Sequence, residues 1–170
     1  GALIWQRNDP PTTGASTVRN TVKMTGDGAS SIYLAGDVYL GGFVAWGIQK
    51  RDSVTGNLIW ELIMNPGGGY YDTVGEVKYY GSALYIAGED EDFGASYSRL
   101  QKLSPVDGSI IFDKVYNTYP CAFAGGIADM DIDSTGIYTV SYRDNCVPPN
   151  SAITPYVEKF NFDGSVAWAV

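Results

Sequence analysis

Gly56-Asn57-Leu58-Ile59-Trp60 is one of four similar segments in which a glycine, a small or amide residue and two aliphatic residues precede a Trp or Phe. The others are Gly1-Ala2-Leu3-Ile4-Trp5, Gly108-Ser109-Ile110-Ile111-Phe112 and Gly164-Ser165-Val166-Ala167-Trp168. Their glycines lie 55, 52 and 56 residues apart, which is near the length of a four-stranded propeller blade, about 40 to 50 residues. The spacing therefore predicts a repeated blade rather than a repeated hairpin.

Two strand-like segments recur within each period. The first contains a tyrosine and is rich in β-branched and aromatic residues, as strands are: Ile32 to Gly36, Leu84 to Gly88 and Ile137 to Ser141. The second contains a lysine and mostly alternates apolar with polar residues, as a half-exposed strand does: Ile48 to Arg51, Leu100 to Leu103 and Val157 to Phe160. Turns rich in Asp, Pro and Gly follow the second segment and favour tight hairpins.

The fold class that follows is all-β, a β-propeller-type array of about three four-stranded antiparallel blades with one extra N-terminal strand. We expect a single domain over residues 1–170, with the extra strand at 1–9 and units at about 17–66, 70–117 and 122–170. No segment has a convincing apolar stripe of 3.6-residue period, so no substantial helix is predicted.

The combination of a Tyr-containing strand that ends in Ala-Gly, a hydrophobic-Gln-Lys strand, an Asp-to-Gly turn and a final Trp resembles the bacterial β-propeller repeat family of the SBBP type. It is more distantly similar to quinoprotein-type repeats. The resemblance covers nearly the whole chain and implies a propeller fold, whereas function differs widely among such folds.

Three blades are fewer than the four to eight of closed propellers, so we expect an open arc with two exposed sheet faces. The chain would then be a fragment of a larger propeller, half of a six-bladed ring, or one unit of a head-to-tail filament. The extra strand at residues 1–9 could instead pair with a neighbouring subunit as a donated strand.

Composition excludes several classes of function. Nineteen acidic residues against eleven basic ones give a net charge of -8, which repels a phosphate backbone, so no nucleic acid is expected as a partner. No apolar run approaches the roughly 18 residues that span a bilayer, so no membrane insertion is expected. Histidine is absent, and no nucleophile and base pair or phosphate loop meets its spacing rule. The chain is therefore predicted not to be an enzyme and to need no cofactor, calcium excepted.

Asp129, Asp131 and Asp133 are the candidate calcium ligands. They alternate with apolar residues, so on a strand their carboxylates would share one face. The alternative is a polar strand face that ends in a turn. The acidic run from Glu89 to Asp92 is expected in a loop, either solvated or gathered around Ca²⁺.

Aromatic residues suggest two different roles. The repeated Trp5, Trp60, Phe112 and Trp168 are predicted to pack between blades. Trp46 lies outside the repeat pattern, in a glycine-rich segment with Tyr39 nearby, and is expected on a loop. There the two aromatics could stack on a sugar ring, or Trp46 could fill a blade interface.

Cys121 and Cys146 are predicted to form a disulfide, with two buried free thiols as the alternative. A disulfide would place the chain outside the reducing cytoplasm, so a secreted or cell-surface location is expected. Either a leader has been removed before Gly1 or the chain is an excerpt of a longer one.

These observations together predict a non-catalytic extracellular structural protein that forms a homo-oligomer or polymer. Association would use the blade ends or the donated strand, in a filament, sheath or adhesion scaffold. The alternative is a propeller module that binds carbohydrate or protein.

Overall fold

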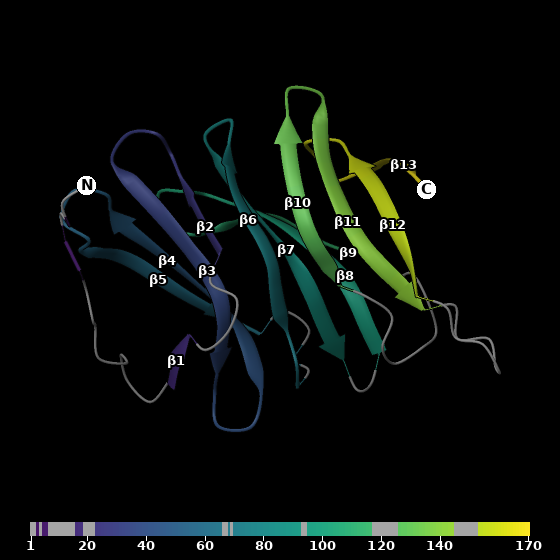
Figure 1. Cartoon of the computed structure of the whole chain (residues 1–170), viewed down its shortest axis with the longest axis horizontal. Coiled ribbons are helices and arrows are strands. Elements are labelled where there is room, and N and C mark those ends of the chain that lie inside the picture. The colour runs from purple at the N-terminus through teal and green to yellow at the C-terminus, as the bar shows by residue number, and fades with distance from the viewer. Residues whose placement is uncertain are drawn as a thin grey trace.

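The computed structural model describes residues 3, 5, 6, 16–18, 23–65, 68, 70–92, 95–116, 126–144 and 153–170. These residues form β-strands and turns, with no helix among them, and the strands make three antiparallel sheets that stand side by side in chain order (Figure 1). Within the same residues, no helix is long and apolar enough to cross a membrane. The all-β prediction is confirmed.

The first sheet contains β1 (Ser16–Val18), β2 (Lys23–Gly26), β3 (Ser31–Tyr39), β4 (Val44–Asp52) and β5 (Leu58–Met64). β3, β4 and β5 pair in order, while β1 and β2 pair with successive parts of β3. β1 and β2 therefore share one innermost position, and the sheet has four positions in width.

The second and third sheets repeat this order with four strands each. The second contains β6 (Thr73–Tyr80), β7 (Ala83–Asp92), β8 (Ala95–Leu103) and β9 (Ile110–Tyr116). The third contains β10 (Ile127–Asp133), β11 (Gly136–Asp144), β12 (Ile153–Phe160) and β13 (Val166–Ala169). Every pairing in these two sheets is antiparallel and joins strands that follow one another in the chain. Two-residue turns make the first hairpin of each of these sheets tight.

The turn glycines explain the period read from the sequence. Gly56, Gly108 and Gly164 have φ angles of 71°, 76° and 81°, a left-handed conformation that glycine adopts without steric cost. Each glycine closes the turn between the third and fourth strand of its sheet. Backbone N–H groups of Gly56 and Gly108 donate to the carbonyls of Asp52 and Ser104, both at 2.9 Å.

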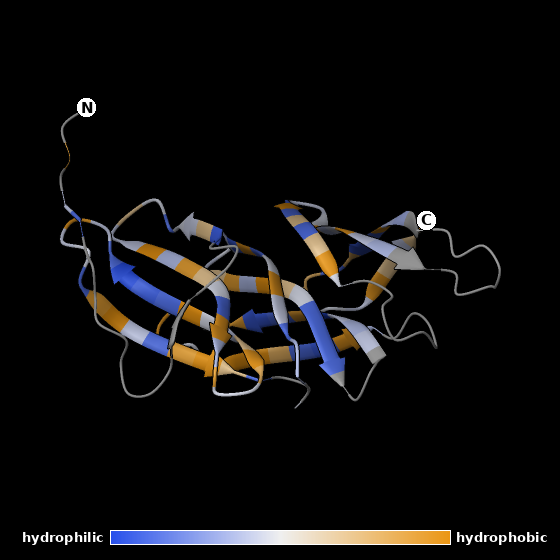
Figure 2. Cartoon of the chain, turned by 60° about the horizontal axis from the view of Figure 1, so that its bottom comes forward, coloured by the Kyte–Doolittle hydropathy of each residue, from blue (hydrophilic) through white to orange (hydrophobic). Residues whose placement is uncertain are grey.

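Apolar side chains between the sheets form two cores, and apolar positions recur along the strands of all three sheets (Figure 2). One core joins the first and second sheets: Tyr33, Ala35, Trp46, Ile48, Val74, Val77, Leu84, Ile86 and Leu103. The other joins the second and third sheets: Ala83, Tyr85, Ala87, Leu100, Ile127, Met130, Ile137 and Phe160. Burial of apolar area between neighbouring sheets is therefore what holds the row together.

The innermost strands approach closely where glycine stands. A Cβ atom added at Gly75 on β6 would lie 1.8 Å from the Ile127 carbonyl oxygen, and one added at Gly126 would lie 2.2 Å from Glu89 Cβ. No side chain fits at those distances. Glycine at these two positions lets the second and third sheets converge at their inner edges.

Four expectations need correction or refinement. The sheets form an open row, so the propeller prediction is confirmed only as three repeated antiparallel sheets. The thirteen strands found among the described residues match the predicted number, but the additional one is β1; of residues 1–9 only 3, 5 and 6 are described, and none lies in a strand.

The other corrections concern Trp46 and the acidic run. Trp46 was expected on a loop, either stacked on a sugar ring or filling a blade interface. It lies instead in the strand β4, and with 0% of its surface exposed it fills the interface between the first and second sheets. The run from Glu89 to Asp92 was expected in a loop, but it continues β7 as a strand, and Asp90 is 2% exposed.

Candidate functional site

The same three-residue cluster occurs on one face of every sheet: a tyrosine, the lysine opposite it and an outer-strand aromatic. We call each a triad, and they are Tyr33, Lys50 and Trp60; Tyr85, Lys102 and Phe112; and Tyr138, Lys159 and Trp168. Their members are directly opposite one another across three strands in all three sheets. The strand registers, which are the same in all three sheets, therefore bring the members of each triad together.

Triad geometry is nearly constant along the chain. The tyrosine and outer aromatic ring centroids are 6.2, 6.5 and 6.3 Å apart in the first, second and third sheets, with tilted planes. The lysine Nζ lies 5.6, 5.3 and 5.1 Å from the tyrosine ring centroid, within cation–π range. Each triad is thus assembled within its own sheet.

The first two triads are covered by the following sheet. Tyr33 and Tyr85 are 1% and 2% exposed. Trp60 lies over Gly108, where an added Cβ would come within 3.4 Å of its ring, and its Nε1 donates to the Pro105 carbonyl at 3.4 Å. Lys50 Nζ donates to the same carbonyl at 2.8 Å.

Phe112 makes the matching contact from the second sheet. Its ring lies over Gly164, 3.2 Å from a Cβ built there. Phe112 has no N–H group, and the neighbouring Tyr116 hydroxyl instead donates to the Gly164 carbonyl. The prediction that the repeated aromatics pack between units is confirmed for these contacts, in which an outer-strand aromatic covers the next turn glycine.

The third triad is uncovered among the described residues. Trp168 is 43% exposed and Val140, two residues after Tyr138 on β11, is 44% exposed. Two cross-strand rows form this surface, which we call the third-sheet end face: Asp131, Tyr138, Lys159 and Trp168 in one row, Asp129, Val140, Val157 and Val170 in the other.

The opposite end of the row also carries exposed apolar side chains. The outer side of the first sheet carries a set that we call the first-sheet end face: Met24, Ile32, Leu34, Gln49, Arg51 and Leu58. Met24 and Leu58 are 65% and 41% exposed, whereas Val77, which occupies the position of Met24 in the second sheet, is fully buried. The residues of the first-sheet end face thus occupy the positions that, in the second sheet, form the interface with the preceding sheet.

Trp5 contacts the first sheet in the same way that Trp60 contacts the second. Its ring lies over Gly56, 2.7 Å from a Cβ built there, and its Nε1 donates to the Ser53 carbonyl at 3.1 Å. Ser53 stands in the first turn where Pro105 stands in the second, so Trp5 repeats the contact of Trp60. Trp5 is the only aromatic in this set that does not come from a described strand.

The predicted calcium ligands lie on the third-sheet end face and its adjoining turn. Asp129 and Asp131 belong to the two rows, and Asp133 follows at the end of β10. The Asp133 carboxylate accepts hydrogen bonds from the Thr135 hydroxyl and N–H, both at 2.7 Å, and these lower its pKa. In the part of the chain that the structure describes, no group of three His, Cys, Asp or Glu side chains is arranged to hold a metal ion.

The remaining predicted site residues fall in two places. Cys121 and Cys146 lie outside the described residues, so their pairing stays a prediction. Tyr39 is 41% exposed, but a fully buried Trp46 presents no ring face to a sugar, and its indole N–H donates to the Glu89 carbonyl at 3.2 Å.

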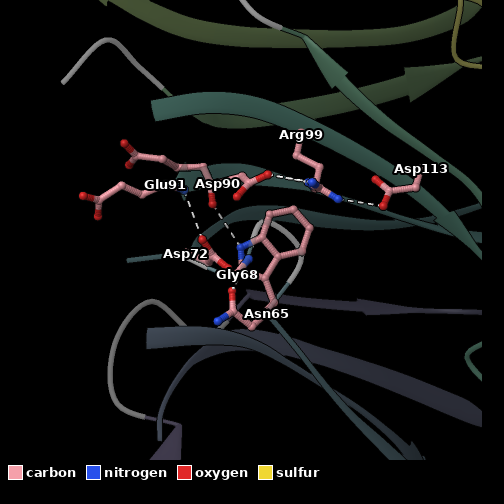
Figure 3. A network of polar contacts seen from close by, with 9 residues as sticks. Asn65, Gly68, Asp72, Asp90, Glu91, Arg99 and Asp113 are labelled. Carbon is pink, nitrogen blue, oxygen red and sulfur yellow. Dashed lines mark hydrogen bonds and ion pairs between the residues drawn. The ribbon is translucent and has the colours of Figure 1, made fainter. Parts of the chain in front are cut away.

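A buried polar network follows the inner part of the second sheet (Figure 3). Arg99 Nε and Nη2 donate to Asp90 Oδ2 at 2.8 and 2.7 Å, and Arg99 Nη1 donates to Asp113 Oδ2 at 2.6 Å. Arg99 and Asp90 are 7% and 2% exposed. This pair was not predicted from the sequence; the available signal was an arginine on the strand that follows an acidic run.

Asp72 belongs to the same region and is a buried carboxylate with a raised pKa. It is 0% exposed; its Oδ1 accepts the Glu91 N–H at 3.0 Å, and its Oδ2 has no hydrogen-bond partner among the described residues. Burial raises the pKa of Asp72 from 3.8 to about 7, against the opposing effect of the Glu91 hydrogen bond. Asp72 is therefore a proton-binding group of the folded state.

A pocket of about 280 Å³ opens where the three innermost strands meet, and its lining includes Lys23, Asp37 and Glu89. Asp37 Oδ1 accepts the Val74 N–H at 2.9 Å, and Lys23 Nζ lies 3.9 Å from Glu76. These charged groups thus make contacts that join the first sheet to the second, which is a structural role.

Comparison with known proteins adds no assignment. No family model matches the chain, and no curated protein gives a significant match.

Proposed function

We propose that this chain is a non-catalytic structural repeat protein that associates with itself through the faces of its end sheets. The observation that carries the proposal is the third triad. Tyr138, Lys159 and Trp168 have the geometry that is covered by a neighbouring sheet at two internal positions, yet Trp168 is 43% exposed. An exposed tryptophan beside exposed valines, on a face with a few charged residues, is a common site of protein association.

The three repeated sheets support a propeller-type arrangement in the assembly. Two copies would supply six sheets, enough for a closed ring, whereas copies joined at a different angle would continue as a filament. The resemblance to bacterial propeller repeats is consistent with either. We place the assembly outside the cell, as a sheath or adhesion scaffold, because the predicted cysteine pair favours an oxidising compartment.

Solution mass, measured by light scattering over a range of protein concentrations, tests this function. The expected result is a mass that rises with concentration, and a limit of two copies would identify a ring. The net charge of -8 makes copies repel one another, so added salt should strengthen association. A single mass of one chain at every concentration and salt level would overturn the proposal.

A second candidate function is carbohydrate binding, and one observation favours it. Tyr39 and Tyr71 lie on either side of Val44. Tyr39 on β3 pairs with Val44 on β4, and Tyr71 pairs with Val44 through an isolated parallel bridge. They are 41% and 61% exposed, and paired strands at this spacing put them about 10 Å apart on one face. Binding to a glycan array that is lost in Tyr71→Ala, without change in solution mass, would support this function.

A further inference from the structure

We infer that the partner of the third-sheet end face is a second copy of this chain, bound head to tail, with Trp168 replacing Trp5 over Gly56. This inference rests on the proposed self-association and specifies its geometry. The first-sheet end face of the second copy would continue the row as a fourth sheet.

The two internal contacts define what the third-sheet end face binds. In both, a triad face packs against the apolar side of the next sheet, and the outer aromatic covers the glycine of that sheet's turn. The described part of the chain has one such apolar side left uncovered by another sheet, on the first sheet, and its turn glycine is Gly56. A second copy therefore offers the matching surface.

The contact made by Trp5 shows that the Gly56 turn accepts a tryptophan. Trp5 Nε1 donates to Ser53 as Trp60 Nε1 donates to Pro105, and both rings lie over the following turn glycine. At 2.7 Å from a Cβ built on Gly56, the Trp5 ring leaves no space for a second ring. Trp168 of another copy must therefore displace Trp5, and the exchange preserves the hydrogen bond to Ser53.

Two polar groups of the third-sheet end face find acceptors or donors in this arrangement. Lys159 would reach the Ser53 carbonyl as Lys50 reaches that of Pro105. Asp131 occupies the position of Thr25, whose Oγ1 accepts the Tyr79 N–H at 3.2 Å across the first internal contact. The group equivalent to the Tyr79 N–H on the first-sheet end face is the Gly26 N–H, so Asp131 gains a charge-assisted hydrogen bond.

A complementation experiment tests this geometry. Trp168→Ala removes the tryptophan of the third-sheet end face, and Met24→Glu places a charge on the first-sheet end face. Both residues are exposed, so each variant should still fold. Each variant alone should associate about 30-fold more weakly than the parent chain, the effect of losing an interface tryptophan or burying a charge. Mixed one to one, they should form a dimer and nothing larger, because one intact pair of faces remains.

Val140→Asp and Leu58→Glu repeat the test at second positions on the two faces. Val106→Glu is the matched control, because Val106 is 76% exposed in the second turn and belongs to neither face; it should associate as the parent chain does. Circular dichroism and thermal melting of each dilute variant would verify that its fold is retained.

Trp5→Ala distinguishes replacement from strand donation. If Trp168 displaces Trp5, this variant should associate more tightly than the parent chain, because the competitor is gone. If the N-terminal segment is itself donated to a neighbour, the same variant should associate more weakly, and the inference would be overturned.

The remaining outcomes are also decisive. A parent chain that assembles while the single variants assemble equally well would overturn the head-to-tail geometry and leave self-association standing. A parent chain that stays monomeric at every concentration would overturn self-association itself.

Discussion

The second and third sheets carry the same triad in two surroundings. Tyr85 is 2% exposed beneath the third sheet, whereas Trp168 of the third triad is 43% exposed. Ring separations of 6.5 and 6.3 Å and lysine distances of 5.3 and 5.1 Å are nevertheless almost equal. The ring and lysine positions of the triad are therefore set by strand register within one sheet. The covering sheet buries the triad without changing these distances.

The largest expected effect on this comparison comes from truncating the tyrosine of the second triad and that of the third. Tyr85→Ala should lower the free energy of unfolding by about 4 kcal/mol, because it leaves a cavity between two sheets. Tyr138→Ala should lower it by only about 1 kcal/mol, since its side chain is partly exposed and no sheet in the described part of the chain covers it. Urea denaturation of dilute protein measures both; equal losses would show that the third triad is as buried as the second.

A second test uses pH to change the charge of Asp72, a buried carboxylate between the first and second sheets. The pKa of Asp72 is about 7 when folded and near 3.8 when unfolded, so the folded state binds the proton more tightly. Stability should therefore fall as pH rises from about 4 to about 7. Asp72→Asn should remove roughly 2 kcal/mol of that fall. Urea midpoints at pH 5 and pH 8, compared between parent and variant, give the result; an unchanged pH dependence would refute it.

The lysines give a smaller effect. Lys50→Met loses a hydrogen bond to Pro105 and a cation over Tyr33 in a covered contact, so a destabilisation of about 1.5 kcal/mol is expected. Lys159→Met, on the uncovered face, should cost about 0.5 kcal/mol. Thermal melts of the two variants measure the difference, and a larger loss at Lys159 would contradict the comparison.

A turn outside both triads supplies the smallest effect and a check on additivity. Ser82 has φ 63° in the β6 to β7 turn, a left-handed conformation that serine adopts at a cost. Ser82→Asn should stabilise the chain by about 0.5 kcal/mol, because asparagine tolerates this conformation better. Combined with either tyrosine variant, the gain should remain the same; a change would mean that the turn is coupled to the triads.

Repetition is what made part of this structure predictable. The turn glycines, the tyrosine strand and the lysine strand occur once per unit, so their spacing predicts hairpins and the faces they share. The same irregularity after Lys50, Lys102 and Lys159 keeps the three registers equal. The lysines were noticed in the sequence, but their position over tyrosine rings follows only from cross-strand pairing.

Features that occur once were not predictable in the same way. Trp46 looks like a loop residue in a glycine-rich segment, and its burial depends on a sheet that begins about 30 residues later. Asp90 looks solvated within its acidic run, but Arg99 on the neighbouring strand pairs with it and allows burial. Both outcomes are set by partners distant in sequence, which local composition does not reveal.

The direction of the aromatic contacts has a consequence for synthesis on the ribosome. Trp60 bonds a carbonyl 45 residues further along the chain. At about 5 to 20 residues per second, roughly 2 to 9 s pass between the emergence of the indole and that of its acceptor. Until the next sheet is synthesised, the aromatic surface of each completed sheet stays exposed to solvent and to other nascent chains. Chaperone capture during that interval, or pairing between adjacent ribosomes on one message, would decide whether the units assemble within a chain or between chains.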